Sequence, residues 1–227
     1  MPEPLNILLE DNHIIAVNKT AHDLVQKDAT GDLSLDDKIK QHIKEKHSKP
    51  GEVFLGVVHR LDRPVTGAVL FARTSKALTR LTTLFREGKI SKTYWAVVKN
   101  KPPKESDRLV HHLVRNAKQN KSYCNEGAKT GSKEAALSYK VIGKSNNYYL
   151  LEVNLETGRH HQIRAQLAHI GCPIKGDLKY GFPRSNPDGG ISLHARKIRF
   201  VHPVTKKEVE IVAEVPEGDI WTAFDIT

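Results

Sequence analysis

Short apolar runs separated by turn-forming residues make up most of this chain, and they constrain its fold more than any other feature of the sequence. Most runs are too short for an amphipathic helix and end near Gly, Pro, Asn, Asp or a group of charged residues. Runs of this kind are typical of β-strands joined by short connections. We expect strands over residues 5–9, 13–18, 53–58, 67–72, 92–98, 108–114, 135–143, 147–155, 191–201 and 207–213.

Three other segments repeat apolar residues at helical spacing. Residues 34–46, 75–87 and 159–170 place apolar side chains three or four positions apart, and a glycine follows the second and the third segment. Many strands joined by short turns, with a few helices, predict the α+β class. We therefore expect a single domain with a mainly antiparallel mixed β-sheet and helices packed against it.

The charge balance limits the class of partner. Lys and Arg number 36 against 26 Asp and Glu, which gives a formal net charge of +10 and a pI of about 9.5. A surplus of this size points to a polyanionic partner, and we expect nucleic acid; the alternative is a basic surface that is merely well solvated. Lysine-rich loops at residues 99–104, 118–121 and 129–133 are the expected phosphate contacts.

The chain shows no sign of a membrane segment or of secretion. No apolar run approaches the ~18 residues of a membrane-spanning helix. The first twelve residues carry two acids and no basic region, so we expect no signal peptide. Cys124 and Cys172 are too far apart for a Cys-x-x-Cys motif. These features predict a soluble, reduced protein of the cytoplasm.

Common cofactor and metal motifs do not occur in the sequence. The glycines form neither a phosphate-binding P-loop nor a GxGxxG motif, and the GxSxG motif of hydrolases is missing. The 12 histidines include adjacent pairs at residues 111–112 and 160–161, but adjacent side chains point in different directions. We therefore expect no cofactor and no metal site.

One acidic residue stands out at the end of an apolar run. Asp62 follows the predicted strand at residues 53–58, lies between Arg60 and Arg63, and precedes a Pro-Val-Thr-Gly turn. The two cations favour the ionised carboxylate, and an ionised carboxylate held between two strands is suited to nucleophilic attack or to stabilising a cation. The alternative is an aspartate that caps the turn and pairs with an arginine at the surface.

The HRLD sequence at residues 59–62, followed closely by Thr-Gly and an apolar strand, resembles the catalytic motif of the RluA-type RNA pseudouridine synthases. Four further stretches resemble motifs of that family in the same order: residues 18–19, 92–97, 155–181 and 193–203. Thr20 stands where the family usually has Pro, and residues 64–66 also depart from the usual motif. Neither departure touches Asp62, so they affect the expected shape of the turn and not the chemistry.

The resemblance implies a role for each of five residues. Asp62 matches the catalytic aspartate, as nucleophile or as base. Arg164 matches the arginine that pairs with it, and Tyr94 matches the tyrosine that packs against the uracil. Arg60 is expected beside the flipped-out base, and Leu193 is expected to pack beneath it. For Tyr94 and Leu193 the alternative is ordinary core packing, and for Arg164 it is a solvated charge.

The resemblance also implies a pseudouridine synthase fold with a central RNA-binding cleft, and an enzyme that isomerises specific uridines in structured RNA without a cofactor. We expect the substrate to be a stem-loop of 23S ribosomal RNA or of tRNA. We further expect a monomer with one catalytic domain over residues 1–227 and no S4-like N-terminal domain. Two rivals remain, a non-catalytic RNA-binding protein on the same fold and a hydrolytic N-glycosidase.

Overall fold

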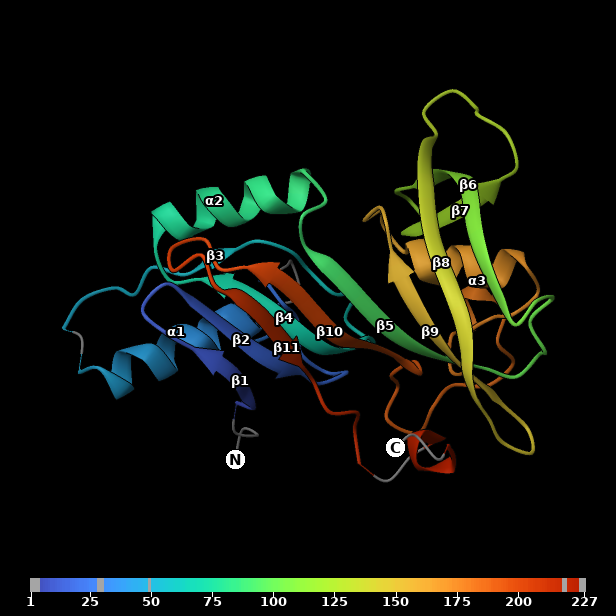
Figure 1. The fold of residues 1–227 in the computed structure, drawn as a ribbon. Coiled ribbons are helices and arrows are strands. Elements are labelled where there is room, and N and C mark those ends of the chain that lie inside the picture. Colours follow the sequence, from blue (N-terminus) through green and yellow to red (C-terminus); the bar gives the residue numbers. More distant parts are fainter. Residues whose placement is uncertain (1–4, 28–30, 49, 218–219, 225–227) are drawn as a thin grey trace. The chain divides into compact units, whose positions relative to one another are not determined.

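The computed structural model describes residues 5–27, 31–48, 50–217 and 220–224, and the chain divides into two compact units. The first unit comprises residues 1–90 and 195–215, and the second comprises residues 91–194 and 216–227. Strand β10 (Leu193–Val201) begins in the second unit and continues into the first (Figure 1).

The first unit is built on antiparallel strand pairs. It contains β1 (Ile7–Glu10), β2 (Ile14–Lys19), β3 (Gly56–Val57), β4 (Thr66–Ala72), most of β10, and β11 (Glu208–Val212). Strand β2 pairs with β1 on one side and with β4 on the other, β3 pairs with the end of β4, and β11 pairs with β10. The turn from β1 to β2 is fixed by Asp11, whose Oδ1 accepts the N–H groups of His13 and Ile14 at 2.7 and 2.8 Å.

Two helices cover the sheet of the first unit. Helix α2 (Ser75–Arg86) packs Ala77 and Leu81 against one face, where Ile14 and Leu70 also point. Helix α1 (Leu35–Lys46) buries the apolar stripe that its spacing predicts. Figure 1 shows α2 above the strands of this unit. Strand β4 is consequently buried along its whole length.

The second unit is a sheet of five antiparallel strands in the part of the chain that the structure describes. Their order is β5 (Ser91–Val98), β9 (Tyr149–Leu155), β8 (Lys133–Lys144), β6 (Ser106–Asn116) and β7 (Lys121–Asn125). Helix α3 (Gln162–His169) packs against β6 and β7, and short 3-10 helices lie at η1 (Leu178–Tyr180) and η2 (Ile220–Ala223).

The predicted α+β class with a mainly antiparallel sheet is confirmed, with three local corrections. The strand expected at 53–58 is reduced to Gly56–Val57, and Phe54 remains 47% exposed. The loop expected at 118–121 ends at residue 120, because Lys121 is the first residue of β7. The mixed polar sequence of β7 gave no alternating pattern from which a strand could be predicted. The helix expected from residue 159 begins at Gln162, because His161 adopts a left-handed conformation with φ 53°.

None of the helices over the described residues is long and apolar enough to cross a membrane. The central RNA-binding cleft stays a prediction.

Candidate active site

Asp62 lies in the connection between β3 and β4, in a turn that its own backbone helps to close. The Val65 N–H donates to the Asp62 carbonyl oxygen at 3.0 Å. Leu61 and Val65 are buried on either side, whereas the Asp62 side chain is only partly covered. The apolar neighbours anchor the turn in the core of the first unit and leave the carboxylate accessible.

Lys19, the last residue of β2, is clamped to the same turn. Its side chain is 1% exposed, and its Nζ donates to the carbonyl oxygens of Thr20, Arg63 and Val65 at 2.7, 2.8 and 2.8 Å. Three acceptors match the three N–H donors of an ammonium group. Burial lowers the pKa of Lys19 to about 7, while the nearby charges of Asp23 and Asp62 act in the opposite direction. Lys19 therefore holds the backbone on both sides of Pro64 and attracts the Asp62 carboxylate.

Gly67 lets β4 approach β10 closely just after this turn. Its φ is +113°, and a Cβ built at Gly67 would overlap the backbone of Ala195. Only glycine satisfies both conditions, because other residues rarely adopt this conformation and carry a Cβ. The Thr-Gly pair of the sequence motif thus has a steric reason in the structure.

The residues that flank Asp62 differ in their surroundings. Arg60 is exposed. Arg63 forms an ion pair with Asp32 at 2.8 Å, in which both side chains are about half exposed, so the pair contributes little to stability. His59 supports the connection: its Nε2 accepts the Leu70 N–H at 3.0 Å, and its ring stacks on a side chain of α2.

Arg164 occupies α3 in the second unit and is buried, not a solvated charge. Its Nε and Nη2 donate to Oδ2 and Oδ1 of Asp177 at 2.7 and 2.9 Å, a bidentate pair in which the side chains are 6% and 1% exposed. The guanidinium also lies 5.1 Å from the ring centre of Tyr180, within the range of a cation–π contact. Two partners therefore fix its orientation.

The start of α3 is tied to the same tyrosine. His161, the residue that caps the helix, places Nδ1 3.0 Å from the Tyr180 hydroxyl. That hydroxyl accepts the Ser122 N–H at 2.9 Å and donates to the Ser122 carbonyl at 3.1 Å. The network joins α3, η1 and β7, and it keeps Arg164 on a rigid support.

The other two predicted binding residues are also in the second unit. Tyr94 lies on β5 opposite Val153 and is 8% exposed, and Leu193 begins β10 and is 3% exposed. Lys92 precedes Tyr94 by two positions on the same face of the strand, and burial lowers its pKa. The structure thus places Asp62 and Arg60 in the first unit, and the remaining three predicted site residues in the second.

Two residues that support the predicted ones lie inside the matched stretches but received no role from the sequence. Lys19 belongs to the stretch at residues 18–19, and Asp177 belongs to the stretch at residues 155–181. Asp177 is the ion-pair partner of Arg164, 13 positions away. Only the folded chain shows what each of them contacts.

Comparisons with known proteins agree with these motifs. The family model described as RNA pseudouridylate synthase matches residues 13–169. The ribosomal large subunit pseudouridine synthase D of Zymomonas mobilis is 31% identical over 226 residues, which cover 94% of this chain and 70% of that protein. The tRNA pseudouridine synthase C of Vibrio parahaemolyticus is 29% identical, and the match covers 97% of this chain and 93% of that protein.

A solved structure shows the same fold. Human RNA Pseudouridylate Synthase Domain Containing 4 matches with a TM-score of 0.77 over 93% of this chain and 89% of that chain, at 24% identity. The family match spans well over half of the chain, and it includes the turn that carries Asp62. The protein therefore belongs to the RluA-type family of RNA pseudouridine synthases, enzymes that isomerise uridine to pseudouridine in RNA.

Proposed function

We propose that Asp62 is the carboxylate that performs the isomerisation. The observation that carries this proposal is that the turn containing Asp62 is fixed in position. The buried Lys19 donates to three backbone carbonyl oxygens, two of them in the turn, and Gly67 packs against β10 directly after the turn. A reacting group must be kept within a fraction of an ångström of its working position, and rigid strands achieve this better than a free loop. The carboxylate itself remains partly exposed, as contact with a nucleotide requires.

The reaction has a simple atom balance. The bond between N1 of uracil and C1′ of ribose breaks, the uracil turns, C5 bonds to C1′, and the proton on C5 is released while N1 gains one. Asp62 can attack C1′ as a nucleophile or remove a proton as a base, and both routes begin from an ionised carboxylate. The target base must leave its stack to reach the carboxylate, which costs a few kcal/mol.

Four further residues are proposed to bind the nucleotide. Tyr94 offers an aromatic ring on a buried strand, and Leu193 offers an apolar surface. Arg164 is preorganised by Asp177, which limits the rotamer entropy lost on binding. Arg60 is exposed, and its planar cation is suited to stacking on bases and contacting phosphate.

The proposed substrate is structured RNA, as a stem-loop of large-subunit ribosomal RNA or of tRNA. Relatives that carry each of these substrates in their names match this chain over more than nine-tenths of its length. We propose that the enzyme acts as a cytoplasmic monomer, and that residues 1–227 form a catalytic domain. Mapping pseudouridine in total RNA with and without the enzyme would separate the two RNA classes.

Replacing Asp62 with Asn tests the central assignment. The amide keeps the size of the side chain and removes the charge, so we expect pseudouridine formation to fall at least ~10³-fold while RNA binding changes little. Release of tritium from RNA labelled at C5 of uridine measures the reaction, and filter binding measures affinity.

Asp32→Asn is the matched control, because Asp32 is exposed in the same unit and pairs with Arg63. That variant is expected to retain nearly full activity. Normal tritium release by Asp62→Asn would refute the catalytic role of Asp62. Accumulation of free uracil with the wild-type chain would indicate glycosidase chemistry instead.

A further inference from the structure

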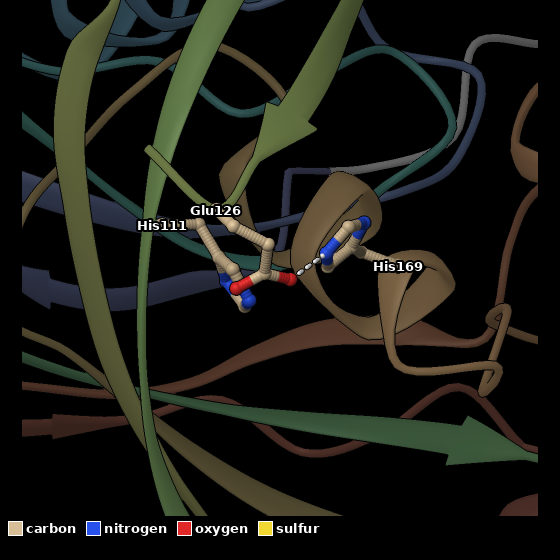
Figure 2. A group of neighbouring side chains, drawn as sticks. All are labelled: His111, Glu126 and His169. Carbon is tan, nitrogen blue, oxygen red and sulfur yellow. Dashed lines mark hydrogen bonds and ion pairs between the residues drawn. The ribbon is translucent and has the colours of Figure 1, made fainter. Parts of the chain in front are cut away.

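Three side chains outside the proposed active-site residues form a compact group in the second unit. His111 lies on β6, Glu126 directly follows β7, and His169 ends α3. One ligand atom from each lies within 4.8 Å of the others. Figure 2 shows the Glu126 carboxylate between the two imidazole rings, whose centres are 4.8 Å apart.

Two of the three groups already share a hydrogen bond. His169 Nε2 lies 2.6 Å from Glu126 Oε1, which brings a nitrogen and an oxygen ligand atom together on one side of the group. Metal ions bind neutral imidazole and ionised carboxylate, so a bound ion takes the place of the proton held between these two atoms.

Gln166 supplies a second observation on the inner side of the group. It is fully buried, its Nε2 lies 3.0 Å from His111 Nδ1, and its Oε1 has no hydrogen-bond partner among the described residues. Its Nε2 also donates to the carbonyl oxygens of Leu109 and Ala135, so the amide cannot turn over without placing Oε1 against them. Gln166 therefore holds the His111 ring in place on the inner side of the group.

We propose that His111, Glu126 and His169 bind a divalent first-row transition-metal ion, with Zn²⁺ as the reference case. Two imidazoles and one carboxylate are a common donor set for such ions, and they leave coordination positions open. Glu126 is 80% exposed, so these positions face solvent. Cys124, two residues before Glu126, does not belong to the group.

The site would brace the helix that carries Arg164. The ligands come from three neighbouring elements that are separated in sequence. A bound ion would therefore connect the end of α3 to β6 and to the segment after β7. This inference does not depend on Asp62, because all three ligands belong to the second unit. Its success or failure is therefore separate from that of the catalytic assignment.

Titration with Co²⁺ tests the proposal on the full chain purified without a polyhistidine tag. We expect one equivalent of Co²⁺ to bind with the visible absorption of a low-coordinate site, and Zn²⁺ to displace it. His169→Gln and Glu126→Gln are each expected to weaken binding at least ~10-fold. His22→Gln is the matched control, because His22 is exposed in the other unit, and it should bind as the wild type does.

Thermal unfolding gives an independent measurement. Saturating Zn²⁺ is expected to raise the Tm of the wild type and of His22→Gln by about 5 °C, and to leave both ligand variants unchanged. Circular dichroism confirms that the variants fold, as expected for two partly exposed positions. Absence of stoichiometric Co²⁺ binding, or equal binding by the wild type and the ligand variants, would overturn the proposal.

Discussion

At the scale of the residue, the turn that holds Asp62 depends on a single buried amine. Lys19 donates hydrogen bonds to the backbone carbonyls of three residues, two of which belong to this turn. A buried carbonyl that loses its donor costs about 1–3 kcal/mol. The lysine therefore acts on the carboxylate indirectly, through the backbone that carries it.

Lys19→Met retains the length of the side chain and removes its donors. We expect this variant to lose about 3 kcal/mol of the free energy of unfolding and to lose activity at temperatures where it remains folded. Urea denaturation followed by circular dichroism measures the first effect, and tritium release measures the second. Lys27→Met, an exposed control in the same unit, is expected to be neutral; a Lys19→Met chain of normal stability would contradict the assigned role.

The pair of Arg164 and Asp177 illustrates how a buried charge depends on its partner. Asp177→Asn leaves Arg164 buried without its counter-charge, and we expect a loss of about 3–5 kcal/mol in the free energy of unfolding. Arg164→Met is expected to cost a similar amount and most of the activity. In the double variant the two losses should be clearly less than additive, because neither charge is then stranded. Additive losses in chemical denaturation would show that the pair is not coupled.

At the scale of the element, alternation and helical spacing predicted most strands and all three α-helices. They failed where long-range contacts decide the structure. Only two residues of the apolar run at 53–58 pair as a strand, with Phe71 and Ala72 at the end of β4, because β10 is the neighbour of β4 on that same side. The polar strand β7 forms because β6 offers it a partner, which no local pattern reveals.

Element docking in the first unit depends on one glutamate. Glu10 ends β1. Its carboxylate contacts His42 and Lys46 on α1 and His47 directly after the helix. It also contacts Arg73, which follows β4. Burial alone would raise the pKa of Glu10, but the hydrogen bonds from α1 outweigh it and lower the pKa to about 2. One side chain thus connects a helix to two strands.

Because the pKa of Glu10 is lower in the folded chain than in the unfolded chain, its stabilisation is complete above about pH 4.5 and is lost as the pH falls toward 2. We expect Glu10→Gln to reduce the free energy of unfolding by about 1–3 kcal/mol at pH 7. The difference from the wild type should shrink steadily below pH 4.5. Denaturation curves between pH 2 and 7 measure it, and a difference independent of pH would show that the charge of Glu10 is not responsible.

At the scale of the whole molecule, the motifs identified the residues proposed for chemistry, and the fold supplied those that hold them in place. Asp62 and Arg164 were predicted from their motifs. Lys19, Asp177 and the His111 group were not predicted as functional, since each depends on contacts between segments distant in the sequence. The sequence predicted no metal site among the histidines, and folding brings His111 and His169 together across 58 positions.

The positive charge of the molecule is expected to act mainly on the RNA backbone. Lys118 and Lys129 are exposed in the second unit, whereas Lys121 lies over the rings of Tyr123 and Tyr180 and is less available. Substitution of both exposed lysines by Glu should weaken RNA binding and reduce the slope of log K against log salt by about 1–2.

A double variant at Lys44 and Lys76, exposed on α1 and α2, makes the same change in net charge and serves as the control. Filter binding over a range of salt concentrations measures both double variants. Equal losses of affinity in the two double variants would mean that only net charge matters. An unchanged slope of log K against log salt in the variant at Lys118 and Lys129 would show that their loops do not contact the RNA.

The close approach of β4 to β10 also has a consequence over generations. Every missense change in the codon for Gly67 adds a side chain that collides with Ala195, whereas Gly51 and Gly127 have open space around them. We therefore expect mutations at residues 51 and 127 to accumulate by drift and those at residue 67 to be removed by selection. The contact between the backbones at Gly67 and Ala195 is thus expected to slow the rate at which the codon for Gly67 changes.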